Sequence, residues 1–201
     1  MAQQAPFADD IRLFRERDAV TPPPKHAILF VGSSSFTKWT DVQDYFPGYP
    51  IINRGFGGSS LPDLIRYAGD IIFPYQPKQI VIYCGENDLA ASDTVSAATV
   101  VSRFKTLFGM IRRQLGETPV VFVSLKPSPS RARLFPKMKE ANAAIKTFLA
   151  TQKKAVFADV YSRMLDANGQ PRESLFVGDM LHMNASGYAI WKQVLLPLLL
   201  K

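Results

Sequence analysis

Five continuous apolar runs divide this sequence, and their placement constrains the fold more than any other feature. They occupy residues 27–32, 50–55, 79–85, 119–125 and 154–160, and the last run is the weakest. None shows the polar alternation of a strand with one solvated face, so each is typical of a strand covered on both faces. Helical patterns separate or follow them, at residues 60–72, 95–115, 137–151 and 185–200. This alternation predicts βαβ units, and therefore a parallel sheet of about five strands with helices on both faces.

The chain before the first run differs from the rest. Phe7, Ile11 and Phe14 follow near-helical spacing, and the proline run 22–24 would stop any helix. We therefore expect residues 1–24 to form a helical arm. Residues 25–201 are expected to form one domain, because 201 residues with 47% hydrophobic content suffice for one substantial core and hardly for two.

The composition argues against several classes of protein. A charged fraction of 20% and 14 phenylalanines argue against disorder. The net charge of +7 permits contact with anionic partners, but the basic residues are scattered, so we expect no nucleic-acid binding. No apolar run is long enough to span a membrane. The first residues do not resemble a signal peptide, although a mature chain could begin this way, so localisation stays open.

Polar and glycine-rich segments follow the apolar runs. In doubly wound sheets, ligands bind in the crevice outside the carboxyl ends of the strands. The segments at those ends are GSSS (32–35), NRGFGGS (53–59), GEND (85–88), KPSPSRARLFPK (126–137) and, before the last helix, GDMLHMNASGY (178–188). We therefore expect the functional site at this edge of the sheet.

His182 is the candidate general base. The other histidine, His26, precedes the first strand, and a solvated or capping role explains it better. Asp179 stands three residues before His182 and could hold one ring nitrogen while the other faces a nucleophile. The spacing alone is weak, because the start of a helix with Asn184 as N-cap also explains this segment. Both interpretations can hold together.

Ser34 is the candidate nucleophile. A serine in a tight strand-to-helix turn exposes its hydroxyl at the sheet edge. Gly58 could present an unobstructed backbone N–H, and Asn87 a side-chain amide, to a developing oxyanion. Each segment taken alone is better explained as a turn or helix cap. A nucleophile, two donors, a base and an acid in separate strand-end loops together favour a hydrolytic site.

These residues, taken together, resemble the SGNH (GDSL-type) hydrolase superfamily. FVGSSS resembles its first block, with Ser34 at the nucleophile position, and INRGFGGSS resembles the second, with Gly58 at the oxyanion glycine. GEND is similar to the third block, with Asn87 as the oxyanion asparagine. DMLHMNASGY is similar to the last, with Asp179 and His182. Only the four blocks in this order are specific, and they span nearly the whole chain.

The resemblance implies a flavodoxin-like three-layer α/β/α sandwich and ester hydrolysis through an acyl-enzyme. His182 would take the proton of Ser34, and Asp179 would orient His182. The N–H groups of Ser34 and Gly58 and the Asn87 amide would hold the oxyanion. Substrates of the family include lipids, thioesters and acetylated sugars. The blocks look nearest to the platelet-activating-factor acetylhydrolase-like and carbohydrate-esterase-like branch. No metal or cofactor is expected, and the oligomeric state is open.

Two further positions bear on the site. The family's first block usually reads Gly-Asp-Ser, whereas Ser33 stands here in place of the aspartate. That aspartate is not the triad acid, so the change does not exclude catalysis, but it removes a carboxylate beside the nucleophile. Arg131, after the fourth run, could meet an anionic or sugar group, although a solvated loop explains it equally well. Ser35 is expected to make local hydrogen bonds.

Three alternatives compete with the hydrolase. A phosphate- or sugar-binding module could use GSSS or GFGGSS, but these lack the Walker lysine and the full dinucleotide spacing. Such a module would also leave Asp179 and His182 without a role. Cys84 could be the nucleophile, but a cysteine in an apolar strand is more often buried packing. A zinc hydrolase is the poorest fit, because the two histidines fall at opposite edges of the sheet.

Overall fold

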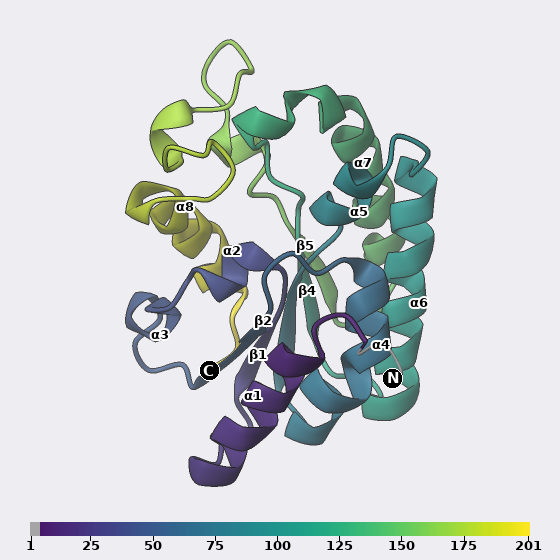
Figure 1. Ribbon diagram of the computed structural model, residues 1–201, viewed down its shortest axis with the longest axis vertical. Helices are drawn as coiled ribbons and strands as arrows, with labels where there is room; N and C mark the ends of the chain where they lie inside the picture. The colour runs from purple at the N-terminus through teal and green to yellow at the C-terminus, as the bar shows by residue number, and fades with distance from the viewer. Residues whose placement is uncertain (1–4) are drawn as a thin grey trace.

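Five parallel strands form the centre of the structure, a computed structural model that describes residues 5–201 (Figure 1). They are β1 (Ile28–Gly32), β2 (Ile51–Gly55), β3 (Gln79–Tyr83), β4 (Val120–Val123) and β5 (Ala155–Ala158). The strand order is β2-β1-β3-β4-β5, with every pair parallel. This is the flavodoxin-like order, whose switch point lies between β1 and β3. Each strand falls within a predicted apolar run, so the predicted sheet is confirmed.

Helices cover both faces of the sheet, as Figure 1 shows. One face is covered by α1 (Ala8–Val20), α4 (Leu61–Ile71), α6 (Ala97–Leu115) and α7 (Phe135–Ala150). The other face is covered by α2 (Ser34–Thr37), α3 (Val42–Tyr45) and α8 (Ala185–Leu195). A further helix, α5 (Glu86–Ala91), follows β3 at the carboxyl edge. Short 3₁₀ turns occupy Phe73–Tyr75, Pro129–Leu134, Ser162–Met164, Glu173–Leu175 and Leu196–Leu198.

The last helix is shorter than its sequence pattern predicts. The apolar pattern extends to residue 200, but α8 ends at Leu195 and continues as a 3₁₀ turn over Leu196–Leu198. Pro197 lies in that turn and has no backbone N–H with which to continue an α-helix. Within residues 5–201, no helix combines the length and the apolar character needed to cross a membrane.

Aromatic packing joins the helices that flank the carboxyl edge. Trp39, which follows α2, stacks on Tyr188 of α8 with ring centroids 4.7 Å apart. Phe36 of α2 meets Trp191 of α8 edge to face at 5.9 Å. The Tyr188 hydroxyl also donates to the backbone oxygen of Ser35 at 2.9 Å. This packing fixes α2 and α8 relative to each other. The helix α2 begins at Ser34, and α8 begins directly after the segment that carries His182.

The helix α1 packs on this chain's own core. Ile11 is buried in the cluster that α4 and α6 share with the sheet. The Phe7 ring meets Phe56 at 5.2 Å, and the Tyr67 hydroxyl donates to the backbone oxygen of Pro6 at 2.6 Å. Residues 1–4 of the predicted arm lie outside the described residues. The N-terminal segment therefore reaches the carboxyl edge of the sheet at Phe7.

Candidate active site

Ser34 begins α2 directly after the turn that ends β1. Gly32 ends the strand so close to β3 that a Cβ there would lie 2.0 Å from the backbone oxygen of Tyr83. Ser33 then adopts an extended conformation as the N-cap, and Ser34 takes the first helical position. Ser34 is half-buried, whereas Ser33 and Ser35 are buried. The three serines are therefore not equivalent, and only Ser34 combines exposure with a position at the sheet edge.

The structure brings Ser34, His182 and Asp179 together, as the sequence predicted. The Ser34 Oγ lies 3.1 Å from the Nε2 of His182, although 148 positions separate them in the chain. The Nδ1 of the same ring lies 2.6 Å from the Oδ2 of Asp179. A neutral imidazole that donates from Nδ1 to the carboxylate has its Nε2 lone pair directed at the serine hydroxyl.

Asp179 is held as a carboxylate by its own loop. Its Oδ1 accepts the backbone N–H groups of His182 and Leu181, each at 2.9 Å. The backbone N–H of His182, followed by the bond to its imidazole, holds the pKa of Asp179 well below the usual aspartate range. The acid therefore stays ionised at neutral pH, where it can fix the ring of His182.

Asn184 anchors the loop that carries this pair. Its Oδ1 accepts the backbone N–H groups of Ser186 and Gly187, which confirms the predicted N-cap of α8. Its Nδ2 donates to the backbone oxygens of Ser174 and Phe176. The Asn184 side chain therefore joins the start of α8 to the segment at residues 174–176.

The two predicted oxyanion residues follow the strands that flank β1: Gly58 lies in the loop after β2, and Asn87 lies in the first turn of α5, after β3. Gly58 has a φ of 85°, a conformation that glycine adopts without strain. The Nδ2 of Asn87 donates to the Oγ of Ser33 at 2.7 Å and to the backbone oxygen of Ser59 at 3.0 Å. The amide of Asn87 therefore joins the loops that follow β1, β2 and β3.

The sequence matches the model of one known protein family. The pattern of the GDSL-like lipase/acylhydrolase family matches residues 25–190, more than three quarters of the chain. The chain belongs to this family. It is therefore an ester-cleaving hydrolase, and the phosphate- or sugar-binding module is not favoured.

Solved structures agree with this GDSL-like fold. An acylhydrolase candidate from Bacteroides fragilis is 19% identical, with a TM-score of 0.82 over 98% of this chain and 97% of the other. A GDSL-like lipase from Bacteroides thetaiotaomicron is 18% identical, with a TM-score of 0.80 over 94% and 96%. An acetylxylan esterase from Geobacillus stearothermophilus, solved as a catalytic mutant, is 13% identical, with a TM-score of 0.68 over 87% and 94%. No curated protein matches the sequence.

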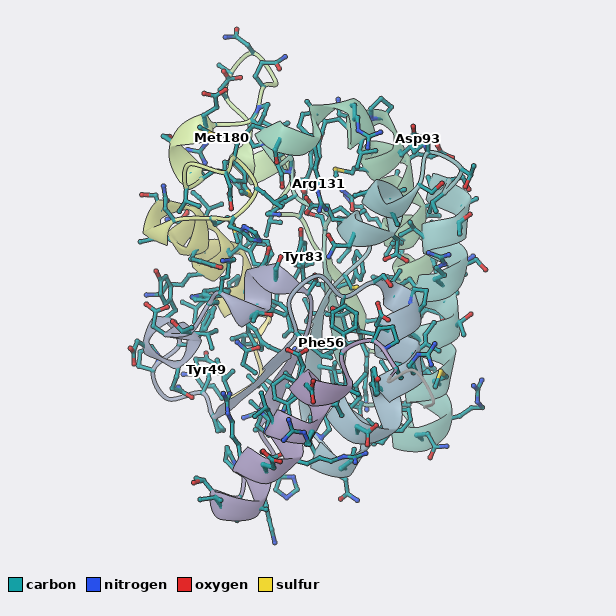
Figure 2. All side chains as sticks on the ribbon, viewed as in Figure 1. Tyr49, Phe56, Tyr83, Asp93, Arg131 and Met180 are labelled. Atoms are coloured by element: carbon teal, nitrogen blue, oxygen red, sulfur yellow. The ribbon has the colours of Figure 1, made fainter. Side chains whose placement is uncertain are left out.

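Arg131 of this GDSL-like hydrolase has its guanidinium engaged by the protein. Its Nη2 donates to the Oδ1 of Asn87 at 2.8 Å, and its Nη1 lies 3.4 Å from the Oε1 of Glu86. Arg131 and Tyr83 both lie at the carboxyl end of the sheet (Figure 2). The side chain is 19% exposed, so only a small part of it remains available to a substrate.

A buried charge network under the site was missed by reasoning from the sequence. The Nζ of Lys126 lies 2.8 Å from the Oε2 of Glu86, and both residues are buried. Glu86 also accepts from the hydroxyls of Tyr83 and Ser128. Burial alone would raise the pKa of Glu86, but the charges of Lys126 and Arg131 outweigh it, and the pKa is lowered. Glu86 is therefore ionised at neutral pH, where it lies beside two cations.

The remaining sequence candidates take no part in the contacts that join Ser34, His182 and Asp179. Cys84 is buried, and burial raises the pKa of its thiol well above the ordinary value, which argues against a thiolate nucleophile. His26 is exposed before β1, as expected. Ser35 differs from its prediction: its Oγ is buried and makes no hydrogen bond within the described part of the chain. Tight packing of Phe36 and Trp39 on one side of α2 accompanies this burial.

The space beside Ser34 is small. A cavity of about 10 Å³ lies between Ser34, Asn87, Arg131 and Leu181. The larger hollows, of about 650 and 670 Å³, lie beside β2 and β5 and include none of these residues. The candidate residues therefore line the small cavity rather than either of these larger hollows.

Proposed function

We propose that this chain hydrolyses small esters through an acyl-enzyme on Ser34, with His182 as general base and Asp179 as the orienting acid. The observation that carries the proposal is the continuous line of contacts from the Ser34 Oγ to the His182 Nε2 and from its Nδ1 to Asp179. Membership of an ester-cleaving family supports it.

In the first half of the reaction, the Ser34 Oγ attacks the ester carbonyl carbon as His182 Nε2 takes its proton. The carbonyl oxygen becomes an oxyanion, which the N–H groups of Ser34 and Gly58 and the Asn87 amide stabilise. The carbon–oxygen bond to the alcohol then breaks, and His182 returns the proton to the departing alcohol. The acyl group remains on Ser34.

In the second half, a water molecule gives a proton to His182 and attacks the acyl carbon. The bond to Ser34 Oγ breaks, His182 returns the proton to that oxygen, and the carboxylic acid leaves. The sum is one ester and one water converted to one alcohol and one acid. Asp179 remains ionised throughout and stabilises the imidazolium of each half-reaction.

We further propose that the acyl group is small, as in an acetyl ester. The cavity beside Ser34 has room for about one water-sized group, which suits a methyl group better than a long chain. We therefore expect kcat/KM to be at least about tenfold higher for p-nitrophenyl acetate than for the octanoate. An equal or higher value for the octanoate would contradict the small acyl site. Acetylated xylo-oligosaccharides and acetylated short-chain lipids would then compare sugar and lipid alcohols.

A fluorophosphonate probe tests the proposed nucleophile. We expect covalent labelling of the peptide that contains Ser34, loss of labelling in Ser34→Ala, and its retention in Ser35→Ala. Labelling that survives Ser34→Ala on a folded protein would assign the nucleophile to another residue. Arg131 remains a candidate contact for an anionic or sugar substituent, which would appear as a rise in KM for such substrates in Arg131→Lys.

A further inference from the structure

We infer that Asn87 stabilises the oxyanion through the hydroxyl of Ser33, which accepts a hydrogen bond from Asn87 and donates its own hydrogen to the reacting oxygen. Ser33 would then be a catalytic residue at the position where the family usually has an aspartate. The inference rests on the proposed reaction at Ser34, and it replaces a direct contact between the Asn87 amide and the oxyanion by a contact from the Ser33 hydroxyl.

Both hydrogens of the Asn87 amide already have acceptors. An amide nitrogen carries two hydrogens, and the Nδ2 of Asn87 contacts the Ser33 Oγ at 2.7 Å and the Ser59 backbone oxygen at 3.0 Å. The amide is also held at its other end, where its Oδ1 accepts from Arg131 at 2.8 Å. A flipped amide would place Oδ1 against the Ser59 oxygen, two acceptors facing each other. Asn87 therefore has no hydrogen left for a direct bond to the substrate.

The hydroxyl of Ser33 has a hydrogen to donate at the right place. Its oxygen accepts from Asn87, and among the described residues it has no other hydrogen-bond partner. Ser33 is 5% exposed and lines the same small cavity as Ser34 and Asn87. A buried donor without an acceptor is costly, and the carbonyl oxygen of a bound ester would supply that acceptor.

The hydrogen bonds that join Arg131, Asn87 and Ser33 all run in one direction, toward the substrate. Arg131 donates to Asn87, Asn87 donates to Ser33, and Ser33 would donate to the oxyanion. Hydrogen bonds in one direction polarise each other, and the cation at the far end strengthens the effect. The buried Glu86 holds that cation in place, with 3.4 Å between their charged atoms. A carboxylate at position 33 could accept from Asn87 but would have no hydrogen to pass on.

A double-mutant cycle on Ser33 and Asn87 tests the relay. We expect Ser33→Ala to lower kcat for p-nitrophenyl acetate about 10- to 100-fold, with KM changed less than about threefold. Asn87→Ala should lower kcat to a similar extent. The kcat of the double variant should be no lower than that of the more impaired single variant, because either substitution interrupts the same series of hydrogen bonds. Ser35→Ala is the matched control, because the buried Oγ of Ser35 has no hydrogen-bond partner among the described residues, and it should keep the wild-type kcat.

Two outcomes would overturn the relay. If Ser33→Ala keeps the wild-type kcat while Asn87→Ala loses it, Asn87 donates directly and Ser33 only accepts. If the two losses multiply in the double variant, the two groups act independently. Thermal unfolding by circular dichroism would verify that each variant is folded. Should Ser33→Ala fail to fold, Ser33→Cys keeps the volume but has a weak donor, and a wild-type kcat there would equally overturn the relay.

The failure of the relay is distinguishable from the failure of the proposed reaction. Fluorophosphonate labelling that is lost in Ser34→Ala establishes the nucleophile whatever the role of Ser33. If labelling does not depend on Ser34, the reaction itself is wrong, and the cycle on Ser33 and Asn87 is then not interpreted as oxyanion stabilisation.

Discussion

The three consecutive serines show how far one residue type can diverge in role within a single turn. Ser33 accepts a hydrogen bond from Asn87, Ser34 faces His182, and the buried Ser35 Oγ has no partner within residues 5–201. The backbone of β1 and α2 decides this, because each successive residue at the start of a helix points in a different direction. The same chemical group therefore serves as a relay candidate, a nucleophile candidate and an unpaired polar atom.

The unpaired hydroxyl of Ser35 predicts a neutral or stabilising substitution. A buried polar group without a partner costs about 1–3 kcal/mol, so Ser35→Ala should leave the free energy of unfolding unchanged or raise it by about 1 kcal/mol. Urea unfolding followed by circular dichroism measures this. Ser124→Ala is the matched control, because the buried Ser124 Oγ accepts the backbone N–H groups of Val160 and Tyr161. It should lose about 1–3 kcal/mol, and equal losses in both variants would contradict the argument.

The carboxylate of Asp179 predicts a large effect on rate. Asp179→Asn replaces one oxygen by an amide that cannot accept from His182, so the ring would favour the wrong tautomer. We expect kcat to fall about 100- to 10,000-fold at pH 7 with the fold retained. The pKa of Asp179 lies well below the usual range, so its protonation should contribute nothing to an acid limb of the wild-type activity above about pH 4.

A similar turn elsewhere provides the control for Asp179. The Oδ1 of Asp166 accepts the backbone N–H groups of Asn168 and Gln170 in an exposed turn. Asp166→Asn should therefore keep the wild-type kcat, measured on p-nitrophenyl acetate. A wild-type kcat in Asp179→Asn would show that His182 does not need this carboxylate.

At the scale of elements, the long strands and helices could be predicted from the sequence, and the short helices could not. The strands β1, β3 and β4 are buried throughout and therefore appear as apolar runs, and α6 spans enough residues to show a full helical period. The edge strands β2 and β5 are only partly buried, which corrects the expectation that all five are covered on both faces. The helices α2 and α3 have four residues each and α5 has six, too few for an amphipathic pattern. Their positions are set by the sheet and by packing against its edge.

Some residues of the candidate site could be predicted from the sequence, and others could not. The proximity of Ser34, Asp179 and His182 could be predicted, because the sequence blocks that carry them resemble the family's blocks in the same order. The partners of Glu86 could not, because Lys126 and Arg131 lie in another loop, 40 residues or more along the chain. No local pattern marks a buried ion pair whose halves follow different strands. Taken alone, the GEND segment predicts a turn or a helix cap, and in the structure its glutamate and asparagine begin α5.

The N-cap of α8 predicts a combined loss of stability and activity. Asn184→Ala removes the acceptor of two helix N–H groups and the donor to Ser174 and Phe176. We expect a loss of about 1–2 kcal/mol in the free energy of unfolding. Since the same loop carries His182, kcat should also fall by several-fold. Urea unfolding and the rate on p-nitrophenyl acetate measure the two effects.

Another capped helix separates the two effects. Ser96 caps α6 by accepting the backbone N–H of Thr99, and α6 carries none of the proposed reacting groups. Ser96→Ala should show a comparable loss of stability with an unchanged kcat. A fall in kcat in both variants would attribute the effect to general destabilisation rather than to the loop of His182.

At the scale of the whole molecule, one buried ion pair connects the core to the site. Glu86 begins α5 shortly after β3, and Lys126 follows β4, so their contact joins the segments that leave the two strands, next to Arg131. Most other ion pairs in the described chain are more exposed, such as that of Lys154 with Glu117. An exposed pair contributes little to stability, whereas a buried charge that loses its partner is strongly destabilising.

The ion pair of Glu86 and Lys126 predicts a free energy of unfolding that depends on pH. The folded pKa of Glu86 is lowered below the unfolded value, so the unfolded chain binds more protons as pH falls below about 4.3. The stabilisation by Glu86 is therefore fully present above that pH and is lost as pH falls through the folded pKa. Glu86→Gln should be about 3–5 kcal/mol less stable at pH 7, because Lys126 becomes an unpaired buried charge. The difference from the wild type should narrow below about pH 4.

Urea unfolding between pH 3 and pH 8 checks this prediction, with Glu117→Gln as the exposed control. The Glu117 side chain is 53% exposed, so its loss should change the free energy of unfolding by less than about 1 kcal/mol at any pH. Replacing both partners in Glu86→Gln/Lys126→Met should recover much of the stability, because the buried charge is removed. If Glu86→Gln matched the wild type at pH 7, the ion pair would not hold the two strand ends together. The positioning of Arg131 against Asn87 would then depend on other contacts.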